Sequence, residues 1–104
     1  MTRYTLTIGL FDKDTKRQKI SSDIALKIVS DLVVQTVGYG TIHNGNGIYT
    51  HTNDQIVCEP SIIYFVDGEE EEESKIKNLA WMIKKALNQE SVMLEETAVK
   101  MEFI

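Results

Sequence analysis

The chain has 104 residues, of which 42% are hydrophobic and 26% charged, and 11 basic against 16 acidic residues give a net charge of −5. This length suits a single domain, 1–104, and the negative charge argues against direct binding to nucleic-acid phosphates. No window approaches about eighteen apolar residues, so the sequence predicts neither a membrane span nor a signal peptide. The lone cysteine, Cys58, cannot form an internal disulfide, which favours a cytoplasmic protein.

The first predicted elements are a strand and a helix. Apolar residues recur at every second position near the N-terminus, as in a strand, at Tyr4, Leu6, Ile8 and Leu10. After a charged connector, residues 21–38 predict a helix with Ser21 or Ser22 as N-cap and Gly38 as C-terminal cap. Apolar residues cover more than one face of this helix, which indicates deep burial or contact with another subunit.

A long hairpin is predicted from Tyr39 to Val66. Asn53 and Asp54 lie between its two strand-like runs, and both tolerate the positive φ of a two-residue turn. That turn would produce three cross-strand pairs: Tyr49 with Cys58, His51 with Ile56, and His43 with Tyr64. The run "SIIYFV" is apolar at consecutive positions, which indicates that both faces of the sheet are covered there.

A second helix and a last strand complete the chain. The helix begins with five glutamates, Glu69–Glu73, and ends near Lys84 and Lys85, a charge order that complements the helix dipole. Its buried stripe is predicted at Ile76, Leu79, Ala80, Ile83 and Leu87, with Trp81 off the stripe. Strand-like runs on either side of "EET" extend the last strand to Phe103. The order βαββαβ predicts a ferredoxin-like α+β fold, an antiparallel sheet with two helices on one face.

Two short motifs carry a resemblance to a known family. The stretch "QIVCEPSIIYFV", followed by a helix and then by "ALNQESVML" and "VKMEF", resembles a family of small bacterial proteins catalogued as a domain of unknown function. The likeness covers about residues 55–103, and its most specific pieces are "EPS" and "QESV". The resemblance implies a ferredoxin-like fold and no established activity.

The stretch "GYGTIHNGNGIYTHTND" is the main candidate for a ligand site. Glycine weakens a strand but lets its backbone approach a ligand closely, and the polar residues around these glycines can hydrogen-bond a nucleotide, sugar or similar molecule. The predicted ligand-binding residues are His43, Asn44, Asn46, Tyr49, His51 and Glu59. The structural alternative is that the twisted hairpin serves subunit assembly.

The sequence gives weaker support for catalytic or metal-binding residues. Glu59, between Cys58 and Pro60, could act as a proton acceptor, although a carboxylate accepting local backbone hydrogen bonds is the more common arrangement. Asp12 and Asp14 form a D-x-D pair that could hold a hard cation, but such pairs in a lysine-rich loop are usually turn formers. His43 and His51 would lie roughly 26 Å apart along a strand. Cys58 is expected to be a small buried hydrophobe. No metal or cofactor is predicted.

Three functions are compatible with these residues. A non-enzymatic module that binds or sequesters a small polar ligand ranks first, because no nucleophile or base dyad is evident. An acidic inhibitor or host-interaction protein of a phage or other mobile element, which presents Glu69–Glu73 to a basic protein partner, ranks second. A small α+β-barrel enzyme with Glu59 or a histidine as base ranks third. In each case we expect a homo-oligomer, most simply a dimer, because one helix layer cannot cover both sides of "SIIYFV".

Overall fold

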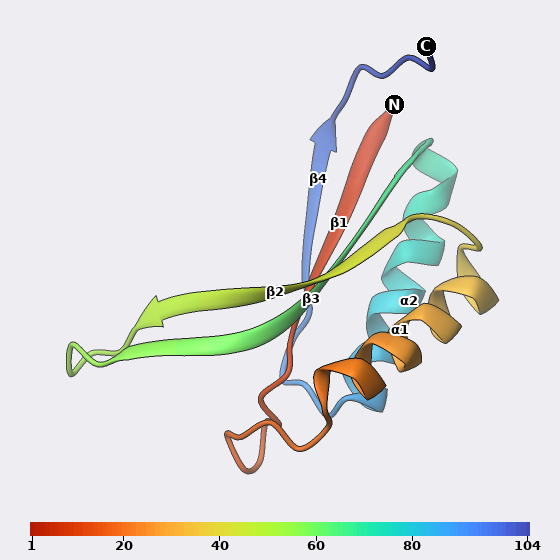
Figure 1. Ribbon diagram of the computed structural model, residues 1–104. Helices are drawn as coiled ribbons and strands as arrows, with labels where there is room; N and C mark the ends of the chain where they lie inside the picture. The colour runs from red at the N-terminus through yellow and green to blue at the C-terminus, as the bar shows by residue number, and fades with distance from the viewer.

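The computed structural model describes residues 1–104 as a four-stranded antiparallel sheet with two helices on one face (Figure 1). The strand order is β2-β3-β1-β4. The elements are β1 (Thr2–Gly9), α1 (Ser22–Thr36), β2 (Thr41–Thr50), β3 (Ile56–Gly68), a 3₁₀ turn η1 (Glu70–Glu72), α2 (Glu73–Ala86) and β4 (Met93–Ala98). The predicted ferredoxin-like fold is therefore confirmed. Neither helix is long and apolar enough to cross a membrane.

The hydrophobic core lies between the sheet and the two helices. The alternating residues predicted for the first strand are all buried: Tyr4, Leu6, Ile8 and Leu10. The stripe predicted for α2 is buried at Ile76, Leu79, Ile83 and Leu87, with Ala80 partly buried against it. Full burial of one such side chain contributes roughly 1.5–3 kcal/mol, so these contacts hold the helices to one face. No element covers the opposite face, which we call the open face.

The capping residues set the ends of α1 as predicted. The Ser21 hydroxyl accepts a hydrogen bond from the Ile24 N–H at 3.3 Å. At the other end Gly38 has a φ of +94°, and its N–H donates to the Val33 carbonyl at 2.8 Å. Glycine adopts this left-handed conformation without steric cost, so the helix stops there.

The hairpin is present, but its predicted register is wrong by one residue. His43 pairs with Ile63 and Tyr49 with Val57, not with Tyr64 and Cys58. The turn has three residues rather than two, because the His51 N–H donates to the Gln55 carbonyl at 2.8 Å and Asp54 takes a positive φ of 64°. His51 therefore lies opposite Gln55 and not Ile56. One additional turn residue shifts every cross-strand pair by one position.

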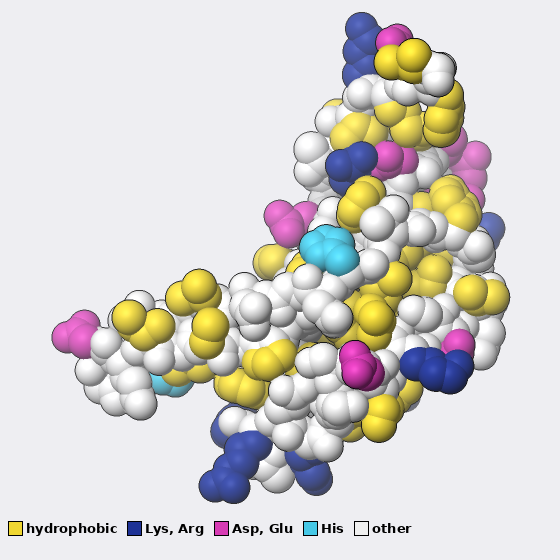
Figure 2. All heavy atoms as spheres, viewed as in Figure 1, with side chains coloured by type: hydrophobic (Ala, Val, Ile, Leu, Met, Phe, Trp, Pro, Cys, Tyr) yellow, Lys and Arg dark blue, Asp and Glu magenta, His cyan; other side chains and the backbone are white.

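The outer halves of β2 and β3 project beyond the helices as an arm, residues 45–61 (Figure 1). The arm lengthens the molecule to 45 × 27 × 24 Å and its radius of gyration to 14.5 Å, above the roughly 13 Å of a compact domain of this length. Figure 2 shows hydrophobic side chains on its surface, and Ile48 and Ile56 are each 72% exposed. Cys58 is exposed too, so the prediction that it is buried is wrong: the helices do not reach this far along the sheet.

The last strand is shorter than predicted. β4 runs through "EET" and ends at Ala98, and residues 99–104 form no strand. Ala98 pairs with Thr2, the first residue of β1, so beyond this point β4 has no neighbouring strand to continue along. One further backbone hydrogen bond, from the Val99 N–H to the Met1 carbonyl at 3.0 Å, closes the pairing.

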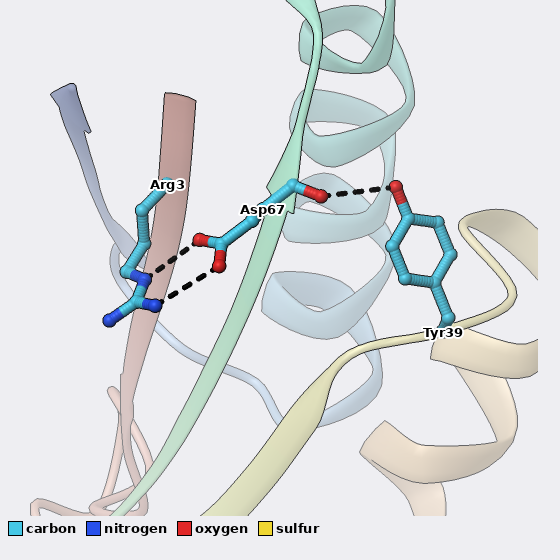
Figure 3. Close-up of polar contacts among 3 residues, drawn as sticks. All are labelled: Arg3, Tyr39 and Asp67. Carbon is cyan, nitrogen blue, oxygen red and sulfur yellow. Dashed lines mark hydrogen bonds and ion pairs between the residues drawn. The ribbon is translucent and has the colours of Figure 1, made fainter. Parts of the chain in front are cut away.

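Polar contacts tie β1 to β3, and β3 to the segment that leads into β2, at the end of the sheet away from the arm. The Arg3 guanidinium donates two hydrogen bonds to the Asp67 carboxylate, at 2.8 and 3.0 Å, and the Tyr39 hydroxyl donates to the Asp67 carbonyl at 3.3 Å (Figure 3). Hydrogen bonding to Arg3 lowers the pKa of Asp67. Arg3 also lies 4.6 Å from the centroid of the Phe65 ring. This end of the open face is thus held by paired charges.

Candidate functional site

A groove of about 700 Å³ lies on the open face, between the arm and the loop that joins β1 to α1. The arm and this loop project from the same end of the sheet, as Figure 1 shows. The start of β4 and the connection from α2 complete the lining. Only four of the fifteen lining residues are hydrophobic, so the groove suits a polar ligand better than an apolar one.

Glu59 lies in this groove with its carboxylate anchored on one side. Oε2 accepts a hydrogen bond from the Phe11 N–H at 2.8 Å, whereas Oε1 has no hydrogen-bond partner within the chain. The predicted backbone hydrogen bond is therefore present, but it comes from a residue 48 positions away rather than from a local bulge. One oxygen fixes the orientation of the carboxylate and the other stays available to a ligand.

Glycines clear the sheet around this carboxylate. A Cβ on Gly9 would lie 2.4 Å from Oε2 of Glu59, so the carboxylate occupies the space of the absent side chain. Gly47 pairs with Glu59 from the neighbouring strand. Ser61 is flanked by Gly9 on one side and Gly45 on the other. Three of the six glycines, Gly9, Gly45 and Gly47, thus border one patch of the open face.

Aromatic rings form the arm side of the groove. Tyr49 and His51 contact each other edge to face, with ring centroids 5.4 Å apart and an interplanar angle of 88°. Both line the groove, together with Gln55 and Val57. Aromatic faces at a polar groove provide stacking surfaces for a planar ring.

Charged residues of both signs occupy the opposite wall. Lys13 and Lys16 come from the loop after β1, and Glu90 comes from the connection between α2 and β4. Neither lysine forms an ion pair within the chain. The groove therefore carries free cationic groups on one wall and the Glu59 carboxylate on its floor.

The structure brings three of the six predicted ligand residues together and separates the other three. Tyr49, His51 and Glu59 line the groove. Asn44 pairs with Ile62, a core residue, and Asn46 lies on the same face two residues further along, so both asparagines face the helix side. His43 lies on the open face but outside the groove, with Nδ1 3.1 Å from the Asn44 carbonyl. Residues opposite each other share a face, so the shifted register decides this division.

Ten groove residues lie outside the hairpin and were not among the predicted ligand-binding residues: Thr7, Gly9, Phe11, Asp12, Lys13, Lys16, Gln89, Glu90, Ser91 and Met93. Gln89, Glu90 and Ser91 belong to the "QESV" motif. Its position at the entry to the last strand was the available signal. Loop residues reach a site through the fold of the chain, which a strand pattern does not record.

The D-x-D pair of the first loop is occupied by hydrogen bonds of its own. The Asn88 side chain donates to Asp12 at 2.7 Å and to Asp14 at 2.9 Å, and the Thr15 N–H donates to Asp12 at 3.0 Å. These bonds, that of Asn88 first, lower the pKa of Asp12 to about 2. The pair acts as a turn former that joins the loop to the end of α2. No three metal-ligating side chains gather anywhere in the chain.

The glutamate run forms a turn and a helix start rather than one uniform patch. Glu70–Glu72 form η1, and Glu73 is the first residue of α2. Glu73 pairs with Lys77 at 3.0 Å, and Glu72 lies 3.7 Å from Lys75. Part of the negative charge is therefore balanced by lysines of α2.

Comparisons with known proteins identify the fold. The structure is similar to a phage SAM lyase in complex with S-methyl-5'-thioadenosine, with 18% identity over 92% of this chain and 79% of that chain and a TM-score of 0.68. It is also similar to a phage SAM lyase in the apo state, with 18% identity over 92% of this chain and 78% of that chain and a TM-score of 0.69. The de novo designed protein Foldit4 is similar over 95% of this chain and 98% of its own, with 14% identity and a TM-score of 0.50. No family model and no curated protein matches the sequence. At these identities the likeness shows the fold alone.

Proposed function

We propose that the groove binds SAM, S-adenosylmethionine, or a related thioadenosine nucleoside, and that the protein cleaves SAM. The observation that carries the proposal is the Glu59 carboxylate, held by the Phe11 N–H on the floor of a polar groove with one oxygen free. The similarity in fold to a phage SAM lyase supports the choice of ligand. This narrows the polar ligand expected from the sequence to one chemical class.

The chemistry of the groove matches the parts of SAM. Tyr49 and His51 offer aromatic surfaces on which an adenine ring can stack. The sulfonium and the ammonium group of SAM are cationic, and an anionic carboxylate such as Glu59 attracts both. Lys13 and Lys16 stand on the opposite wall, where they complement the carboxylate of the methionine tail. A groove of about 700 Å³ is large enough for a ligand of this size.

Cleavage rather than storage is favoured by Glu59. When SAM becomes S-methyl-5'-thioadenosine, the bond between sulfur and the γ carbon of the methionine tail breaks, and its electron pair stays on sulfur as a neutral thioether. Glu59 can accept the β proton in an elimination that forms a carbon–carbon double bond. If instead the substrate's own carboxylate attacks the γ carbon and closes a lactone, Glu59 holds the cationic groups in place. Both routes balance without water, and the four-carbon product distinguishes them.

We also propose that the working protein is a homo-oligomer, most simply a dimer. The arm exposes Ile48 and Ile56, and Trp81 on α2 is 57% exposed. Large apolar side chains grouped on a projecting arm favour contact with another copy. Because the arm also forms one wall of the groove, a second copy that binds the arm would lie close to the ligand.

Incubating the purified protein with SAM and separating the products by mass spectrometry tests the proposal. We expect S-methyl-5'-thioadenosine from the wild type and a loss of at least about 100-fold in Glu59→Gln, which keeps the shape but removes the charge. Glu95→Gln is the matched control, because Glu95 is exposed on β4 and does not line the groove. Binding of SAM without any product would support a sequestering protein. No binding of SAM or thioadenosine by calorimetry would refute both forms of the proposal.

A further inference from the structure

Two residues far apart in sequence bind the same stretch of backbone at the groove. The Phe11 N–H donates to Glu59 Oε2 at 2.8 Å, and the Phe11 carbonyl accepts a hydrogen bond from Gln89 Nε2 at 3.0 Å. Glu59 belongs to the "EPS" motif and Gln89 to "QESV", the two motifs of the sequence that no other role explains. Glu59 and Gln89 thus bind the N–H and the carbonyl of the same residue, Phe11.

Gln89 is built into the fold rather than mobile. Only 6% of its surface is exposed, and its Nε2 also donates to the Leu87 carbonyl at 3.2 Å. Its own N–H donates to the Lys84 carbonyl at 2.9 Å. A buried amide with both donor hydrogens engaged has a fixed orientation, so it can fix the backbone that it contacts.

Phe11 lies beyond the regular part of β1, which ends at Gly9. The backbone there is held by main-chain hydrogen bonds on either side of Phe11 and by an isolated bridge between Phe11 and Gln18. Among side chains, only Gln89 donates to the Phe11 carbonyl. Gln89 thus adds a tie from the end of α2 to this backbone, and it contributes to the direction of the Phe11 N–H that holds Glu59.

We propose that Gln89 is a positioning residue that acts through the Phe11 backbone to hold the Glu59 carboxylate toward the ligand. The inference rests on the proposed function for its consequence in catalysis, but its geometric part concerns the protein without ligand. Only a side chain with two donor hydrogens can serve both carbonyls. Gln89→Met keeps the length and removes both donors, and Gln89→Glu is nearly the same shape with no donor when ionised.

The geometric part is tested without any ligand, at one fixed pH, from the position of the Phe11 amide resonance in NMR spectra. An N–H that donates to a carboxylate is shifted downfield, so Glu59→Gln should move this resonance upfield. Gln89→Met should move it in the same direction by at least half as much. Asn88→Gly is the control, because it cuts the neighbouring bonds to Asp12 and Asp14 but leaves Gln89 in place. If Gln89→Met does not fold, Gln89→Glu is measured instead.

The catalytic part is tested by a double-mutant cycle on SAM cleavage. Gln89→Met should lower the rate by about 10- to 100-fold, because small displacements of a catalytic group have effects of this size. In the Glu59→Gln background the same change should have no further effect, and Asn88→Gly should stay within about threefold of the wild type. An unchanged Phe11 amide resonance in Gln89→Met, or an equal loss with and without Glu59, would overturn the proposal. If the Phe11 resonance responds to both substitutions but the wild-type protein neither binds nor cleaves SAM, the proposed function alone would be overturned.

Discussion

Replacing Gly9 with alanine should disable the groove while leaving the fold intact. The new Cβ would lie 2.4 Å from Oε2, 2.7 Å from Cδ and 2.8 Å from Oε1 of Glu59. Ordinary contact needs about 3.5 Å, so the carboxylate must move by roughly 1 Å, and the 2.8 Å hydrogen bond from Phe11 is lost. The end of a flexible side chain can move in this way without displacing the backbone.

Gly9→Ala has two opposite effects on the free energy of unfolding, and they nearly cancel. Losing the hydrogen bond costs about 1 kcal/mol, and alanine in a strand is favoured over glycine by roughly 0.5–1 kcal/mol. The melting temperature should therefore change by less than about 5 °C, whereas SAM cleavage should fall by about 100-fold. Gly47→Ala is the control, since its Cβ would meet nothing closer than 3.5 Å. Normal activity in Gly9→Ala, or an equal loss in Gly47→Ala, would refute the assigned role of Glu59.

Three further changes test other parts of the structure. Asn88→Gly should raise the pKa of Asp12 from about 2 toward its ordinary value. In the wild type the pKa of Asp12 is lower in the folded than in the unfolded state, so ionised Asp12 stabilises the fold fully above about pH 4 and this stabilisation is lost toward pH 2. Thermal denaturation should therefore show that the variant loses less stability than the wild type between about pH 4 and pH 2. Replacing Ile48 and Ile56 with serine should change the stability of the monomer by less than about 0.5 kcal/mol each but shift sedimentation toward monomer, and an unchanged oligomer would contradict contact through the arm. Glu72→Gln should leave the melting temperature unchanged or raise it, because Oε2 of Glu72 is buried without a hydrogen-bond partner and glutamine removes the charge from that site; a marked loss would point to an unrecognised partner of the carboxylate.

The fold could be predicted because each element carries its own local signal. Alternation marked the buried face of β1, Ser21 and Gly38 marked the ends of α1, and a stripe of apolar residues marked the inner face of α2. Errors arose where the outcome depended on a distant partner. β4 ends because β1 begins at Thr2, and Cys58 is exposed because the helices stop short of the arm. Neither the end of β4 nor the exposure of Cys58 can be predicted from the local sequence alone.

The site was predicted in part for the same reason. The polar residues of the hairpin could be recognised, but one extra residue in the turn decided which of them face the groove. Asn44 and Asn46 were included although they lie on the other face. Gln89 could not be found by any side-chain pattern, because its contact with Glu59 passes through the main chain of Phe11.

Three of the six glycines, Gly9, Gly45 and Gly47, lie together in the sheet. Each one in a strand weakens it by roughly 0.5–1 kcal/mol relative to alanine, so several in one sheet are a considerable cost for a small domain. Gly9, Gly45 and Gly47 all pair with Ser61 or Glu59 and lie on the open face. Side chains at Gly9 or Gly45 would collide with the residues beside them, Glu59 and Ile63. At Gly9 the strand is weakened where the Glu59 carboxylate needs free space, which is the arrangement expected if Glu59 meets a ligand there.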